Sequence, residues 1–263
     1  MEKVKIAFAG GRLLGVRTLK WLASQELFDV IAVCPVPLIS DPDYYGKMTD
    51  IINENSFYTC DIDKLIDKEI DIGLSVNYHK IIGENILNHC KKGFYNVHHS
   101  YNLRLRGRNI TTHALLNTLQ EDVFYHGTTL HLMVSELDAG GIVASEAINI
   151  ETTDTAYSLF NKTDEVALKM IIEWFPRIAK EKIFLYHPPE EGVHSYKNSD
   201  LPSREININM SEQTIDSYIR AFDFPGKEPA YIQEHGRKIY LVFEKRDQYN
   251  KKFVLHGKTY YTE

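Results

Sequence analysis

The chain has 263 residues, 43% of them hydrophobic, and a formal net charge of −6. This length and apolar content exclude a disordered chain and allow one large domain, or one domain with a small appendage. A mildly acidic chain lacks the overall positive field that gathers polyanions, which argues against nucleic acid as a partner.

The three cysteines, Cys34, Cys60 and Cys90, are widely spaced and form no CxxC pair. This spacing argues against a disulfide framework and against structural zinc, so we expect a reduced, cytoplasmic setting. The apolar run after Met1 is too short for a signal peptide, and no other run approaches the length needed to cross a membrane. We therefore expect no membrane partner.

Apolar runs alternate with helical patterns along the N-terminal part of the chain. The runs predict strands at 4–10, 28–36, 56–60, 71–78 and 93–100, and the patterns between them predict helices at 15–24, 44–55, 61–70 and 80–90. This alternation predicts an α/β fold: a Rossmann-like, mostly parallel sheet with helices on both faces. In such sheets, ligands bind outside the carboxyl ends of the strands.

The pattern changes in the second half of the chain. It predicts a helix at 108–120, strands at 122–135 and 140–150, and a long helix at 153–180 capped by Thr153 or Asp154. A Pro-, Gly- and polar-rich stretch follows, and beyond it come a helix at 211–222 and two hairpins that turn at His-Gly. We expect a catalytic domain at 1–186, a linker at 187–202 and a small α+β C-terminal appendage at 203–263.

The stretch "FYNVHHS" at 94–100 carries an amide and an imidazole at the end of a predicted strand. Asn96 and His98 are two residues apart, so they share a face, and His99 points to the other face. With Asp138, in the turn "ELDAGG", they could serve acyl transfer to an amine: Asn96 and His98 would stabilise an oxyanion, and His98 or Asp138 would accept a proton. Spacing alone is equally compatible with a surface histidine and an ordinary turn aspartate.

Two further stretches are candidate anion sites. "RLRGRN", residues 104–109, brings three arginines to the start of a predicted helix, which suits a phosphate or carboxylate as well as it suits a solvated loop. "GGRLLG" after the first strand lacks GxGxxG spacing, but Arg12 is within reach of a phosphate there. No histidines stand at metal-ligand spacing, so we expect no metal.

Three motifs in this order resemble the formyltransferases that use 10-formyltetrahydrofolate: "FAG", "NVHHS" followed by "RGRN", and "LDAGGIV". The stretch 203–226, "SREININMSEQTIDSYIRAFDFPG", is similar to the segment that leads into the C-terminal region of formyltransferases acting on nucleotide-linked amino sugars. The resemblance implies that the catalytic group is Asn96, His98 and Asp138. The chain departs from the family's S-L-L-P at Ser100–Leu103, which reads "SYNL".

The resemblance also implies two ligands. The co-substrate 10-formyltetrahydrofolate would contact Ser75, Asn77, Tyr78, His79 and Ile81 in the loop "SVNYHKII", and Leu137 and Gly140 in the turn around Asp138. A nucleotide-linked amino sugar would contact Arg12, Arg106, Gly107, Arg108 and Asn109.

The expected function is transfer of a formyl group to the amine of a nucleotide-linked amino-dideoxysugar, a 4-amino-4,6-dideoxyhexose first of all, for surface polysaccharide or glycan synthesis. The alternatives are hydrolysis of formyltetrahydrofolate, formylation of methionyl-tRNA, and a nucleotide-sugar-binding module without activity. The short region after the linker and the negative net charge argue against the tRNA substrate. We expect a two-fold homodimer, the commonest state for such enzymes.

Overall fold

The computed structural model of the chain describes residues 2–118 and 123–263. These residues form two compact units. Unit 1 consists of the described residues up to Arg104, together with Thr128–Glu146 and Asp164–Val193. Unit 2 consists of the described residues of Leu105–Gly127, with Ala147–Thr163 and His194–Glu263.

The helices and strands follow the expected alternation. The α-helices are α1 (Arg12–Ala23), α2 (Tyr45–Glu54), α3 (Glu84–His89), α4 (Ile110–Asn117), α5 (Ala156–Lys180) and α6 (Glu212–Phe222). Short 3-10 helices are η1 (Ile62–Asp67), η2 (Tyr101–Leu103) and η3 (Asn198–Asp200). The strands are β1 (Val4–Gly10), β2 (Phe28–Pro35), β3 (Ile72–Val76), β4 (Phe94–His98), β5 (Leu105–Gly107), β6 (Tyr125–Leu132), β7 (Ile142–Asn149), β8 (His194–Tyr196), β9 (Ala230–Glu234), β10 (Arg237–Leu241), β11 (Lys251–Leu255) and β12 (Lys258–Thr262).

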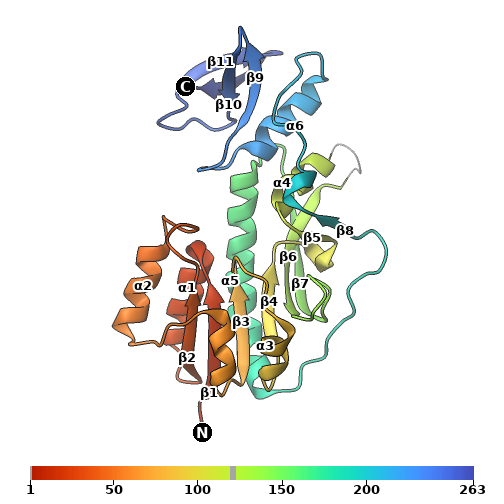
Figure 1. Cartoon of the computed structure of the whole chain (residues 1–263). Helices are drawn as coiled ribbons and strands as arrows, with labels where there is room; N and C mark the ends of the chain where they lie inside the picture. Colours follow the sequence, from red (N-terminus) through yellow and green to blue (C-terminus); the bar gives the residue numbers. More distant parts are fainter. Residues whose placement is uncertain (1, 119–122) are drawn as a thin grey trace. The chain divides into compact units, whose positions relative to one another are not determined.

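A six-stranded sheet in the order β2-β1-β3-β4-β6-β7 carries the fold (Figure 1). The pairs β1–β2, β1–β3 and β3–β4 are parallel, whereas β4–β6 is antiparallel. The predicted Rossmann-like, mostly parallel sheet is therefore confirmed, and its parallel part ends at β4.

Both faces of the parallel part of the sheet are covered, and alternate residues of β1 pack against different helices. On one face, Ile6 and Phe8 of β1 belong to a core cluster with residues of α1, α2 and α5. On the other face, Ala7 and Ala9 belong to a cluster with residues of η1 and α3. A strand buried on both faces must be apolar at every position, which is why β1 reads "VKIAFAG" with no polar residue after Lys5.

Three local expectations are corrected. The strand expected at 56–60 is a single bridge between Val33 and Thr59, which follows a residue with positive φ, Ser56. The helix expected at 61–70 is the 3-10 helix η1. The cap of α5 is neither Thr153 nor Asp154 but Thr155, whose Oγ1 accepts a hydrogen bond from Ser158 N at 3.1 Å. Residues 119–120 of the expected helix and residue 122 of the expected strand lie outside the described residues.

Both C-terminal hairpins turn where they were predicted to turn. His235–Gly236 joins β9 to β10 with φ of 46° and 75°, and His256–Gly257 joins β11 to β12 with φ of 50° and 80°. Two consecutive positive φ angles define the turn that matches the twist of a two-residue hairpin, and glycine at the second position lowers its cost.

The segment 187–202 contains structure of its own: strand β8, which pairs in parallel with β5, and η3. The three-part division at 186, 202 and 203 stays a prediction. No helix of the described residues has the length and apolar character needed to cross a membrane.

The end of α6 is fastened by a buried carboxylate. Asp223 is fully buried and accepts hydrogen bonds from Phe243 N at 2.7 Å and Glu244 N at 3.1 Å, and it forms an ion pair with Arg246. It therefore ties the loop after β10 to the helix.

We predict that Asp223→Ala lowers the free energy of unfolding by about 3 kcal/mol or more, because it leaves the half-buried Arg246 guanidinium and two backbone donors without their buried acceptor. Glu228→Ala is the matched control, since the Glu228–Lys238 pair is exposed and should contribute less than about 1 kcal/mol. Urea unfolding of the full chain measures both values, and equal effects would contradict this account.

Candidate active site

The candidate site begins with a row of polar side chains across three strands of unit 1. Asn96 of β4 lies opposite Ser75 of β3 in the parallel pair and opposite His131 of β6 in the antiparallel pair. His98 follows on the same face of β4, at its carboxyl end. The polar row thus stands where the parallel sheet stops and an antiparallel strand begins.

His131 is the residue that sequence reasoning missed. Its side chain is buried, with Nδ1 3.1 Å from the Leu132 carbonyl oxygen and Nε2 3.3 Å from Asn96 Nδ2. A carbonyl only accepts, so Nδ1 carries the proton, and Nε2 accepts a hydrogen bond from the Asn96 amide. The contact fixes which way the Asn96 side chain faces. The sequence around His131 carries no signal for this contact, because it arises from the antiparallel pairing of β4 with β6.

Asp138 reaches the same place from the turn after β6. Its Oδ2 lies 3.7 Å from His98 Nδ1, and its Oδ1 lies 3.9 Å from His131 Nε2. The side chains of His98 and Asp138 are 11% and 9% exposed, so little water screens the pair. The structure therefore brings together the predicted trio of Asn96, His98 and Asp138.

The turn that carries Asp138 is closed by a glycine with no room for a side chain. A Cβ on Gly140 would lie 1.7 Å from the Leu132 carbonyl oxygen, and Asp138 itself has a φ of 49°. Aspartate tolerates this left-handed conformation better than most residues. The path of the backbone, rather than side-chain packing, delivers the carboxylate.

His99 lies on the opposite side, as its position in the strand predicts. Its Nε2 is 3.0 Å from Asp164 Oδ1 of α5, and both side chains are buried. This pair belongs to the support of β4 and not to the trio.

The predicted folate-side residues lie after β3 and in the Asp138 turn. Ser75 is buried, whereas Ile81 and Leu137 expose 81% and 55% of their surface. Asn77 has a φ of 52°, and its buried side-chain Nδ2 has no hydrogen-bond partner among the described residues. A buried amide donor without an acceptor, beside exposed apolar side chains, fits a polar aromatic co-substrate.

Two members of the same loop have contacts within the chain. Tyr78 packs against the cluster that contains Cys34, and burial raises the pKa of its hydroxyl. The Tyr78 and His79 rings meet edge to face, with centroids 4.9 Å apart. Tyr78 thus supports the loop from the core side.

The predicted substrate-side residues are divided between the units. In unit 1, Arg12 has a φ of 55°, and its backbone N donates to Asp41 Oδ2 at 2.5 Å. In unit 2, Arg106 and Gly107 belong to β5, Arg108 follows, and Asn109 precedes α4 with a φ of 55°.

The loop at 100–103 explains the missing proline. Leu103 has a φ of 55°, which a proline ring forbids. Hydroxyl groups hold this path: Ser145 Oγ accepts from Asn102 N at 2.8 Å, and Thr129 Oγ1 donates to the Ser100 carbonyl at 2.6 Å.

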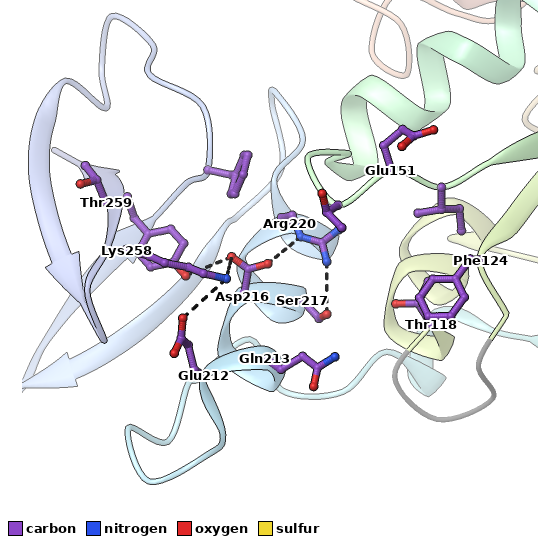
Figure 2. A pocket seen from close by; sticks show the side chains of 14 residues that line it. Thr118, Phe124, Glu151, Glu212, Gln213, Asp216, Ser217, Arg220, Lys258 and Thr259 are labelled. Carbon is purple, nitrogen blue, oxygen red and sulfur yellow. Dashed lines mark hydrogen bonds and ion pairs between the residues drawn. The ribbon is translucent and has the colours of Figure 1, made fainter.

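Unit 2 also has a cavity of about 650 Å³ beside α6, and none of the predicted site residues lines it. Figure 2 shows its charges engaged with one another: Arg220 Nε lies 2.9 Å from Asp216 Oδ2, and Lys258 Nζ lies 3.3 Å from Asp216 Oδ1 and 3.7 Å from Glu212 Oε1. Because these charged groups pair with one another, we interpret the cluster as structural. Within the part of the chain that the structure describes, no cluster of three or more His, Cys, Asp or Glu residues is arranged to hold a metal ion.

Comparisons with known proteins agree on one family. The model of the family described as "Formyl transferase" matches residues 36–175, more than half of the chain. The GDP-perosamine N-formyltransferase of Brucella melitensis is 32% identical over 173 residues, which are 65% of this chain and 64% of that protein. The match thus spans less than two thirds of that curated relative.

Two further matches are a curated relative and a solved structure. The methionyl-tRNA formyltransferase of Thermotoga neapolitana is 30% identical over 174 residues, 65% of this chain and 53% of that protein. A Helicobacter canadensis N-formyltransferase, solved with folinic acid and dTDP-3-aminofucose, superposes with a TM-score of 0.78 at 18% identity, covering 99% of both chains. At that identity, the superposition shows a shared fold.

We predict that Gly140→Ala lowers the free energy of unfolding by about 1–3 kcal/mol, because the new methyl group displaces the Asp138 turn from Leu132. Gly46→Ala in α2 is the control: a Cβ there meets nothing within 4 Å, so stability should rise by up to about 1 kcal/mol. Thermal and urea unfolding test the pair, and a Gly140→Ala variant as stable as the wild type would refute the close contact.

A further prediction concerns His113, a buried residue of α4. Burial lowers the pKa of its imidazole, and the charge of Asp200 partly opposes this shift. The unfolded chain takes up this proton near the ordinary pKa of 6.5, whereas the folded chain resists it. Stability should therefore fall as pH drops below that value, by up to about 1.4 kcal/mol at pH 5.5. Urea unfolding at pH 7.5 and 5.5 measures how much unfolding free energy is lost between the two pH values. This loss should be smaller for His113→Phe than for the wild type, and equal losses would contradict the role given to His113.

Proposed function

Because the chain belongs to the formyl transferase family, we propose that it transfers a formyl group from 10-formyltetrahydrofolate to the amine of a nucleotide-linked amino-dideoxysugar. The observation that carries the proposal is the convergence of His98 and Asp138 at 3.7 Å, with Asn96 oriented beside them by His131. The identity to a GDP-perosamine N-formyltransferase supports the sugar class of acceptor.

The chemistry assigns a task to each member of the trio. The sugar amine attacks the formyl carbon, and the carbonyl oxygen becomes an oxyanion that Asn96 Nδ2 and a protonated His98 stabilise. Asp138 Oδ2 faces His98 Nδ1, so it orients the ring. The amine's proton goes to Asp138, or to a neutral His98 that then donates to the oxyanion. The bond between the formyl carbon and the folate nitrogen breaks and that nitrogen gains a proton, so the transfer needs no net acid or base.

The proposed place of the folate donor is in unit 1. The unpartnered Asn77 amide offers a hydrogen bond to a polar edge of the folate, and the exposed side chains of Ile81 and Leu137 offer apolar contact. Ser75, Tyr78, His79 and Gly140 complete the proposed folate side. The residues proposed to contact the nucleotide sugar are Arg12 in unit 1 and Arg106, Gly107, Arg108 and Asn109 in unit 2, because guanidinium groups pair with a diphosphate.

The similar proteins use sugars linked to two different nucleotides, GDP and dTDP. The Brucella enzyme's name specifies a GDP-sugar, and the Helicobacter structure contains a dTDP-sugar with an amine at carbon 3. We propose a 4-amino-4,6-dideoxyhexose as the acceptor, because the relative at 32% identity acts on perosamine, and we place the product in surface polysaccharide or glycan synthesis.

Formylation of methionyl-tRNA is the second candidate, favoured by the 30% identity to the Thermotoga enzyme. A net charge of −6 works against it, because tRNA binding draws most of its affinity from neutralising phosphates.

The test offers the full chain 10-formyltetrahydrofolate with GDP- and dTDP-linked 4-amino and 3-amino sugars, with methionyl-tRNA, or with no acceptor. We expect formylated nucleotide sugar by mass spectrometry, and most rapidly from a 4-amino sugar. Formylated methionyl-tRNA as the only product, or release of formate without any acceptor dependence, would overturn the proposal.

Variants of the trio test the mechanism. His98→Asn, Asn96→Ala and Asp138→Asn should each lower kcat/KM by about 100-fold or more while thermal unfolding stays near that of the wild type. His235→Asn is the matched control, since His235 is exposed in the turn between β9 and β10 of unit 2. Near-normal rates for His98→Asn would reject the assignment.

A further inference from the structure

The segment expected to be a linker pairs with the loop Leu105–Asn109 of unit 2, which we call the arginine loop. Strand β8 pairs in parallel with β5, and the register sets Tyr196 opposite Gly107. Arg108 N donates a hydrogen bond to the Tyr196 carbonyl oxygen at 2.9 Å. Residues about ninety positions apart in sequence therefore share backbone hydrogen bonds at the loop.

The two backbones approach so closely that only glycine fits. Gly107 has a φ of +90°, and a Cβ there would lie 2.2 Å from the Tyr196 carbonyl oxygen. The glycine of "RGRN" is thus explained by a crossing strand, in addition to its unusual φ angle.

The side chain of Tyr196 makes contacts on the other side, with α4. Its ring stacks on His113, with centroids 3.7 Å apart and planes 12° apart, and its hydroxyl accepts a hydrogen bond from Asn117 Nδ2 at 3.0 Å. His113 and Asn117 lie one turn apart on the same face of α4. His113 N in turn donates to the Asn109 carbonyl.

We propose that Tyr196 is a positioning residue for nucleotide-sugar binding: its main chain holds Gly107–Arg108, and its side chain anchors that loop to α4. This inference rests on the proposed binding role of the arginine loop. A loop ordered before the ligand arrives spares the cost of ordering it on binding.

Loss of this positioning should change KM for the nucleotide sugar and not kcat. Contacts to a diphosphate are alike in the ground state and the transition state of formyl transfer, because the phosphates do not react. Their loss weakens binding uniformly, which raises KM and leaves kcat unchanged.

The experiment compares Tyr196→Ala, which removes the stack and the hydroxyl, with Tyr196→Phe, which keeps the stack. Tyr196→Ala should raise KM for the nucleotide sugar about tenfold or more, with kcat and KM for the folate donor within about twofold of wild type. Tyr196→Phe should restore most of the affinity. Tyr240→Ala is the control, since Tyr240 belongs to a C-terminal hairpin and bonds Glu228.

Two further measurements keep the result decisive. His113→Leu removes the stack from the other side and should raise KM in the same direction even if Tyr196→Ala misfolds. Trypsin should cleave after Arg106 and Arg108 faster in Tyr196→Ala than in the control, because the loop loses its anchor. Unchanged KM in both stack variants, or a fall in kcat alone, would overturn the inference.

Binding of GDP and dTDP by calorimetry separates this inference from the proposed function. A wild-type chain that binds a nucleoside diphosphate, and loses that affinity with Tyr196→Ala, upholds the positioning role even if no formyl transfer occurs. A wild-type chain that transfers formyl groups while Tyr196→Ala binds normally upholds the function and refutes the positioning role. Failure of the wild type to bind either nucleotide refutes the inference.

Discussion

The register between β4 and β6 is the constraint on which the candidate site depends. β4 is the last parallel strand and β6 runs against it, so Asn96 lies opposite His131 and His98 lies opposite Thr129. The turn after β6 then brings Asp138 Oδ2 to 3.7 Å from His98 Nδ1. A slip of one residue would turn His131 to the other face and carry Asp138 away from the imidazole. One hydrogen-bonded ladder thus sets the amide, the two imidazoles and the carboxylate together.

Five residues with left-handed backbone lie in or next to the loops that carry predicted site residues in the two units. Asn77, Asn102, Leu103, Asn109 and Asp138 all have φ angles between 49° and 55°. Four of the five are Asn or Asp, the residues that tolerate this conformation, and the fifth is a fully buried leucine held from both sides of its loop. Each such position costs about 1 kcal/mol or more, which the surrounding packing and hydrogen bonds must offset. The strain is local to the ends of the strands, while the two-faced core beneath them is regular.

How much of this could be read from the sequence depends on how local each feature is. The parallel sheet follows from apolar runs and helical periods, and the hairpins follow from His-Gly turns, because each signal lies within a few residues. The sequence was enough to predict Asn96, His98 and Asp138 as candidates. The rule that ligands bind at the carboxyl ends of parallel strands applies to the whole sheet, and it adds to what the local spacing shows. His131 and Tyr196 could not be predicted in this way, because their roles arise from pairing with strands distant in sequence, and nothing near them indicates the partner. The strand expected at 56–60 failed for the related reason that its apolar residues have only a single bridge to pair with.

Two glycines show how backbone contact, more than side-chain choice, shapes the functional loops. Gly140 closes on the Leu132 carbonyl in unit 1, and Gly107 closes on the Tyr196 carbonyl in unit 2, and neither leaves space for a methyl group. Gly46 and Gly192 have nothing within 4 Å of the same position. Steric need therefore separates glycines that hold a loop in place from those that do not, even though all of them look alike in the sequence. Gly140 allows the turn that places Asp138 beside His98, and Gly107 allows Arg108 to lie beside β8. The path of the backbone therefore sets where these charged residues lie.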